Sequence, residues 1–249
     1  MVSDIKQTIL LPFWDTIPKH SLAYAKILSE AYNKPISLLK LGKKNSEDYS
    51  DINYHIIYSN KKLTEAIIES IEQQDSVIVV WQYERNSRQI QAMLNACRSL
   101  RIPYFFVTAE HAIKAPEKIL LPMSFLIEDR EKATWGRSLN IRFGSEFFIL
   151  KPNDKGTRAA KNVSFIEDFF KKNNIPHKTI QGKKSSFKND KEASDLYSML
   201  NDLIIVTASR EYGLDDQFFG PKERNIIKNS NTPVMLLNPR GDLYVLCGD

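Results

Sequence analysis

Short, continuously apolar runs alternate along the chain with longer stretches in which apolar residues recur every three or four positions. Continuous runs such as Thr8 to Pro12 and Lys118 to Pro122 are typical of strands covered on both faces. Three-four spacing is typical of helices with one buried side. This alternation predicts right-handed crossovers and mostly parallel sheets. The predicted strands are residues 8–12, 36–41, 54–58, 76–81, 103–107, 118–122, 146–150, 177–181, 202–207 and 233–237.

The helical spacing also predicts which side chains face the core. The inward residues expected are Ala23, Ile27 and Ala31; Leu63, Ala66, Ile67 and Ser70 or Ile71; Ile90, Met93, Leu94, Cys97 and Leu100; Val163, Ile166 and Phe170; and Ala193, Leu196, Tyr197 and Leu200.

The chain repeats this pattern once. The matching segments are Ile9–Pro12 with Ile119–Pro122, Ser76–Val80 with Asp202–Val206, and Leu100–Val107 with Ser230–Leu237. Such repetition predicts an α/β protein made of two tandem copies of an open, mostly parallel five-stranded sheet with flanking helices. The boundary is placed near Ala115 and Pro116, giving domains at residues 1–115 and 116–249. The tail from Leu243 to Leu246 is a candidate eleventh strand.

Composition narrows the class of protein. The 249 residues are 42% hydrophobic and 26% charged, as in globular proteins. No stretch approaches the roughly 20 apolar residues of a membrane helix, and the first residues lack the apolar segment of a secretion signal. We therefore expect a cytoplasmic protein with no membrane partner. The two cysteines, Cys97 and Cys247, are too far apart in sequence for a Cys-x-x-Cys motif.

The net charge of +5 is unevenly distributed. Residues 151–191 contain eleven basic and four acidic residues, so this region is strongly positive. It could be an anion or nucleic-acid patch. Scattered lysines with little arginine are more typical of a solvated face, so a nucleic-acid partner is not expected.

The segment from Ile204 to Leu237 combines a strand, a polar loop, Gly220, a helical stretch and a final Thr-Pro-Val strand. It resembles the carboxyl-terminal part of the universal stress protein family, in which the fourth strand runs into Gly, two residues, Gly, nine residues, Gly, then Ser or Thr. The resemblance extends over essentially the whole chain as two tandem copies. It implies a Rossmann-like fold related to the adenine nucleotide α-hydrolases. In ATP-binding members the glycine amides and a helix amino end approach the ribose and triphosphate.

Most of this motif is altered in the second copy. The two first glycine positions correspond to Thr207 and Arg210, the third to Gly220, and the hydroxyl position to Pro221. Side chains at the first two positions restrict the backbone and crowd a phosphate, and Pro221 removes an amide donor and a hydroxyl. Pro221 still suits the first turn of a helix.

The family's nucleotide binders also carry an Asp after the first strand. The corresponding residues are Trp14 in the first copy and Ser124 in the second, with Asp15 one place further on. The first copy's loop after Val80 has no glycine and is shorter. The resemblance therefore implies that the first copy does not hold a triphosphate in the family's way.

Two interpretations of the second copy's loop remain. Arg210 could pair with a phosphate, Ser209 could donate a hydrogen bond, and Gly213 could keep the loop supple. Alternatively, Gly220 serves only the turn into its helix and Arg210 is a solvated residue. The sequence thus favours a universal-stress-type regulatory or interaction protein, not an enzyme, with a degenerate ATP site in both copies and no cofactor. The alternative is an ATP- or AMP-binding universal stress protein with a modified loop.

Other chemistry has little support in the sequence. The four histidines have no spacing that places two on one helix face, and Gly-x-Ser-x-Gly and Walker motifs do not occur. The Ser-Gly-Gly-x-Asp-Ser phosphate loop of the related pyrophosphatases and synthetases is also missing. Asp215 and Asp216 are interpreted as favourable dipole partners near a helix start or as solvated acids. Tyr104 to Phe106 are interpreted as a core or interface strand.

Members of the family commonly dimerise through the final strand of the sheet. A tandem chain satisfies that pairing internally. We therefore predict an internal pseudo-dimer in which Pro103 to Val107 lies beside Pro233 to Leu237.

Overall fold

The structure is a computed structural model that describes residues 7–42, 53–208 and 222–239. The chain divides into two compact units, residues 1–113 and 114–249. The expected boundary at residues 115 and 116 lies two residues further along. The candidate eleventh strand from Leu243 to Leu246 lies outside the described residues.

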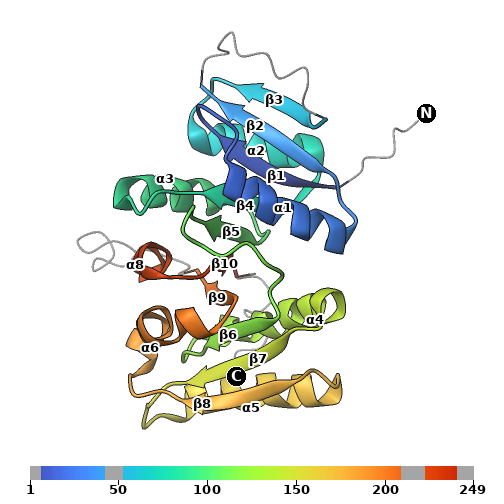
Figure 1. The fold of residues 1–249 in the computed structure, drawn as a ribbon. Coiled ribbons are helices and arrows are strands. Elements are labelled where there is room, and N and C mark those ends of the chain that lie inside the picture. Colours follow the sequence, from blue (N-terminus) through green and yellow to red (C-terminus); the bar gives the residue numbers. More distant parts are fainter. Residues whose placement is uncertain (1–6, 43–52, 209–221, 240–249) are drawn as a thin grey trace. The chain divides into compact units, whose positions relative to one another are not determined.

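The first unit contains a parallel sheet with the strand order β3-β2-β1-β4-β5. Helix α1 packs on β1 and β4, whereas α2 and α3 pack against each other (Figure 1). Its elements are β1 (Thr8–Phe13), α1 (Lys19–Tyr32), β2 (Ile36–Leu41), β3 (His55–Ser59), α2 (Leu63–Gln74), β4 (Ser76–Gln82), α3 (Ser87–Cys97) and β5 (Tyr104–Val107).

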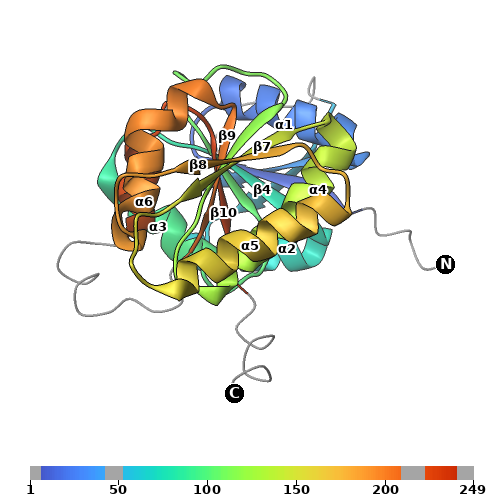
Figure 2. The same cartoon turned by 90° about the horizontal axis from the view of Figure 1, so that it is seen from below.

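The second unit contains a parallel sheet with the order β10-β9-β6-β7-β8. Helices α4 and α5 lie on one side of this sheet and α6 on the other (Figure 2). Its elements are β6 (Lys118–Pro122), the 3-10 turn η1 (Ile127–Arg130), α4 (Glu131–Phe143), β7 (Glu146–Lys151), α5 (Thr157–Lys172), β8 (His177–Gln181), α6 (Ser186–Glu192), the π turn η2 (Ala193–Tyr197), the 3-10 turn η3 (Ser198–Leu200), β9 (Leu203–Thr207), α8 (Lys222–Asn229) and β10 (Val234–Leu237).

The predicted α/β class and parallel strands are confirmed. Each of the ten predicted strands is present, with its ends shifted by at most one residue. The strands β1 and β9 are buried at every residue, because helices cover both faces of the sheet. Tyr104 to Phe106 are fully buried in β5, as a core strand requires.

Two predicted helix faces are wrong. In α1 the residues expected to face inward, Ala23, Ile27 and Ala31, are only half-buried. The residues that α1 buries are Ser21, Tyr24, Ala25 and Leu28. The large side chains of Tyr24 and Leu28, four residues apart, turn this side of the helix toward the sheet.

The second error follows α6. Ala193 is buried as expected, but Leu196 is 56% exposed and Leu200 is 68% exposed. The chain forms a π turn at residues 193–197, and the wider turn shifts the periodicity of the segment. Ser194 and Ser198 consequently face inward, joined by a 2.6 Å hydrogen bond from the Ser198 hydroxyl to the Ser194 carbonyl.

Candidate functional site

The fold marks one edge of each sheet as the place for a ligand. In each unit the two strands that follow the central strand, β1 or β6, are added on one side of it, and the last two strands are added on the other side. Open parallel sheets bind ligands at the carboxyl ends of the strands where this reversal occurs. The expected ligand positions are therefore the carboxyl ends of β1 and β4 in the first unit, and of β6 and β9 in the second.

A buried ion pair occupies this position in the second unit. The Lys132 Nζ lies 2.8 Å from the Asp129 Oδ1, and the two side chains are 1% and 4% exposed. Thr207, the last residue of β9, donates its hydroxyl to Asp129 Oδ1 at 3.0 Å. The Ser124 amide donates to Asp129 Oδ2 at 2.6 Å, and Lys132 also donates to the Pro122 carbonyl at the end of β6. The carboxyl ends of β6 and β9 are thus joined through one carboxylate.

The local sequence explains this placement. The turn η1 runs directly into α4, so Asp129 and Lys132 are three residues apart on neighbouring turns. The preceding loop is fixed by Asn162 of α5, which is 3% exposed. Its amide donates to the carbonyls of Ser124 at 3.1 Å and Leu126 at 2.8 Å.

The partners of Asp129 determine its charge. Burial by itself would raise the pKa of Asp129, but the Lys132 ammonium and the hydrogen bonds from Lys132, Ser124 and Thr207 outweigh it and hold the pKa below its usual value. Asp129 is therefore ionised near neutral pH. The charge of Lys132 is balanced by Asp129 inside the protein.

Helix α6 closes the neighbouring part of the same edge. The amide of Asn189, which is fully buried, donates to the carbonyls of Met123 at 2.8 Å and Leu150 at 2.7 Å. Met123 directly follows β6, and Leu150 is the penultimate residue of β7. Glu192 accepts the amides of Lys183 and Lys184, each at 2.8 Å, just beyond β8. Side chains of the chain itself therefore bind the backbone at three strand ends.

Aromatic side chains take the corresponding place in the first unit. Trp14 follows β1 and stacks on Trp81 of β4, with ring centroids 6.1 Å apart and planes 25° apart. Trp81 is fully buried, and its indole N–H points at the Cys97 sulfur at 3.3 Å. Cys97 is fully buried, as its expected inward position requires, and burial raises the pKa of its thiol.

The structure brings together two of the residues singled out by sequence. Ser124 and Thr207 both bind Asp129. The other expected site residues lie outside the described part of the chain: Ser209, Arg210, Gly220 and Pro221. Gly213, Asp215 and Asp216 also lie outside it. Asp15 is exposed.

Sequence reasoning missed the central residues of the site, Asp129 and Lys132. The signal that was available is an acid and a lysine three residues apart at the start of a helix that follows a buried strand. Such a pair is ordinarily assigned to the solvated side of a helix. Its burial depends on the conformation of the loop before the helix, which the spacing of residues does not predict.

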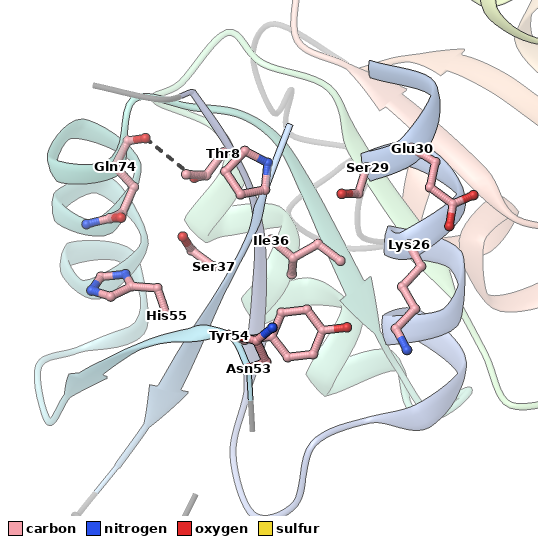
Figure 3. Close-up of a pocket in the computed structure, with 11 residues that line it drawn as sticks. Thr8, Lys26, Ser29, Glu30, Ile36, Ser37, Asn53, Tyr54, His55 and Gln74 are labelled. Atoms are coloured by element: carbon pink, nitrogen blue, oxygen red, sulfur yellow. Dashed lines mark hydrogen bonds between the residues drawn. The ribbon is translucent and has the colours of Figure 1, made fainter. Parts of the chain in front are cut away.

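A hollow of about 760 Å³ lies at the opposite, amino ends of the first unit's strands (Figure 3). It is lined by Thr8, Ile36 and His55, the first residues of β1, β2 and β3. The Thr8 hydroxyl contacts the Gln74 carbonyl at 3.4 Å and the Ser76 hydroxyl at 2.9 Å. Parallel sheets hold ligands at the other ends of their strands, so we assign this hollow no function.

Within residues 7–42, 53–208 and 222–239, no three His, Cys, Asp or Glu side chains gather as metal ligands would. No helix in those ranges has both the length and the apolar character needed to cross a bilayer.

The chain matches no known protein-family model and no curated protein in sequence. Solved structures with the same fold include a universal stress protein from Archaeoglobus fulgidus, with a TM-score of 0.70 and 11% identity over 96% of this chain and 98% of that one. A putative universal stress protein from Pseudomonas aeruginosa has a TM-score of 0.61 and 12% identity over 94% of each chain. A functionally unknown protein from the same species has a TM-score of 0.60 and 12% identity. This chain therefore has the fold of the universal stress proteins over almost its entire length.

Proposed function

We propose that the protein is a universal-stress-type regulatory or interaction protein that catalyses no reaction. In this proposal residues 1–115 and 116–249 are two universal-stress-like domains, and the nucleotide position of each is taken by the protein's own side chains. One observation carries the proposal. The carboxyl ends of β6 and β9 are joined through the buried Asp129–Lys132 pair, to which Thr207 donates.

The chemistry of this pair opposes nucleotide binding. A phosphate placed beside Thr207 would approach the ionised Asp129 carboxylate, whose Oδ1 lies 3.0 Å from the Thr207 hydroxyl. Like charges at such distances repel strongly when water is excluded. Lys132 offsets part of this repulsion, but it cannot turn to the phosphate, because breaking its pair with Asp129 would leave a buried charge without a partner.

The first copy supports the same conclusion in a different way. The stacked rings of Trp14 and Trp81 stand at the ends of β1 and β4. Trp14 corresponds to the position of the family's nucleotide-contacting Asp. An indole ring supplies apolar surface and one N–H donor and no acceptor, so it does not replace the carboxylate.

Calorimetric titration of the purified protein with ATP and Mg²⁺ tests the proposal. We expect no saturable heat. Micromolar binding would overturn it. If that binding were also weakened by Arg210→Ala, the result would support the alternative, an ATP- or AMP-binding protein with a modified loop that uses Ser209 and Arg210.

The absence of catalysis is tested separately. Phosphate release from ATP and from pyrophosphate should remain at the background rate in the presence of Mg²⁺. Turnover above background that co-purifies with the protein, and that disappears in a variant at its carboxyl edge such as Thr207→Val, would contradict a purely regulatory role.

A further inference from the structure

Two adjoining cavities lie beside the amino end of α5, outside the closed edge described above. One, of about 400 Å³, runs between η1 and α5 and includes Arg130, Arg158 and Asn162 in its lining. The other, of about 470 Å³, extends over residues 154–159 to Phe187. Phe125 and Arg158 line both cavities. We call the combined depression the α5 groove; each of its parts has the size of a small-molecule site, roughly 300 to 1,000 Å³.

The α5 groove has an aromatic wall. Phe125, from the loop after β6, contacts Phe187 of α6, with ring centroids 5.0 Å apart. Phe187 is 77% exposed, so most of its ring remains open to a further contact. An exposed phenylalanine at a cavity mouth offers a flat apolar surface on which another ring can stack.

The groove also carries an excess of positive charge. Lys155, Arg158 and Lys161 line it and are exposed. None of these three forms an ion pair with an acid among the described residues. Arg130 is held differently, by a 3.0 Å hydrogen bond to Asn162 and by stacking 4.9 Å from the centre of the Phe165 ring.

Two acids, Glu128 and Asp154, also line the groove and offset part of this charge, because four basic residues (Arg130, Lys155, Arg158 and Lys161) stand against two acids. Glu128 is only 7% exposed. Asp154 accepts the Ser186 amide at 3.0 Å and the Ser186 hydroxyl. The groove therefore combines a net positive wall with an apolar one.

We propose that the α5 groove binds a small organic anion in which a flat apolar ring carries a phosphate or carboxylate group. The ring stacks on Phe125 and Phe187, and the anionic group meets Arg158, whose planar guanidinium suits two-point contact with either group. This inference goes beyond the proposed function, since the groove uses none of the residues that bind Asp129 and holds whether or not ATP binds elsewhere.

The test uses 1-naphthyl phosphate and 1-naphthoate as probes, with uncharged 1-naphthol for comparison, titrated into the full-length protein and followed by naphthalene fluorescence and by calorimetry. We expect at least one anion to bind saturably and at least tenfold more tightly than 1-naphthol. The ratio of the two anions distinguishes a phosphate site from a carboxylate site.

Paired charge reversals on α5 provide the control. Arg158→Glu should weaken anion binding at least tenfold, whereas Lys172→Glu, at the far end of the same helix, should change it less than twofold. Phe187→Ala should weaken binding at least threefold. All three residues are exposed, so the circular dichroism spectrum of each variant should match that of the wild type. No saturable binding of either anion, equal binding of 1-naphthol, or equal losses in both charge reversals would overturn the proposal.

Discussion

At the scale of single residues, the site depends on a pair of charges that water cannot reach. Asp129 and Lys132 are both almost completely buried, and removing such charges from water is costly unless each finds a partner and hydrogen bonds. Asp129 receives hydrogen bonds from Lys132, Ser124 and Thr207. The pair is therefore tolerated because both oxygens of Asp129 and the ammonium of Lys132 are bound, and it should be sensitive to loss of either member.

Asp129→Asn should reduce the free energy of unfolding by about 3–5 kcal/mol, because Lys132 remains buried without a counter-charge. Urea unfolding followed by circular dichroism measures the change. Asp168→Asn, an exposed acid on α5, is the matched control and should change stability by less than about 0.5 kcal/mol. Adding Lys132→Met to Asp129→Asn should recover part of the loss. The pairing would be contradicted if the double variant lost as much free energy of unfolding as Asp129→Asn and Lys132→Met lose together.

The same carboxylate predicts a dependence on pH. The pKa of Asp129 is lower in the folded protein than the value of about 3.9 for Asp in an unfolded chain. Its contribution to stability is therefore complete above about pH 4 and is lost as the pH falls through the folded pKa. Urea unfolding from about pH 7 to about pH 3 should show a steeper loss for the wild type than for Asp129→Asn. Parallel curves would show that Asp129 is not the titrating group.

At the scale of elements, the strands were predictable and the site was not. Continuous apolar runs identify strands such as β1 and β9 because both faces of a parallel sheet are buried. Helix faces are less certain, since one π turn was enough to turn Leu196 and Leu200 outward. Ser124 and Thr207 were found by motif position. Asp129 was not, because its role arises from a loop conformation and from a residue 78 positions away in sequence.

The packing of α4 on its neighbours gives a prediction at this scale. Gly136 lies inside α4, and a Cβ there would be 2.6 Å from the Phe170 Cζ and 3.4 Å from the Phe147 Cε1. Phe170 and Phe147 are fully buried, and their ring centroids lie 4.8 Å apart. Neither ring therefore has room to move away from an added Cβ.

Gly136→Ala should therefore lower the free energy of unfolding by about 1–3 kcal/mol. This change is opposite in sign to the gain of about 1 kcal/mol expected from helix propensity alone. Gly156→Ala is the control, because nothing lies within 4 Å of its Cβ position. A stabilised Gly136→Ala protein, measured by urea unfolding, would show that α4 does not approach Phe170 this closely.

At the scale of the whole molecule, the two units have the same strand order relative to their central strands. Their connections differ: residues 42–54 join β2 to β3, whereas residues 152–176, which include α5, join β7 to β8. The longer connection of the second unit includes α5, which borders the α5 groove. The parallel strands of both units were predictable from the apolar runs, and the different ways of closing the two carboxyl edges were not.

The pairing of Pro103–Val107 with Pro233–Leu237 stays a prediction. It implies that residues 1–115 and 116–249, produced together as separate chains with a tag on one, should purify as a one-to-one complex. Charge reversal at the exposed Arg98, outside both strands, should leave the complex intact. Two soluble halves that separate during purification would contradict the internal pseudo-dimer.

A crystal structure of the protein grown with ATP and Mg²⁺ tests the central claim most directly. We expect the Asp129–Lys132 pair to be intact and bound by Thr207, with no nucleotide at the ends of β6 and β9. A nucleotide seated there, with its phosphates against Gly220 and the ion pair displaced, would contradict the account.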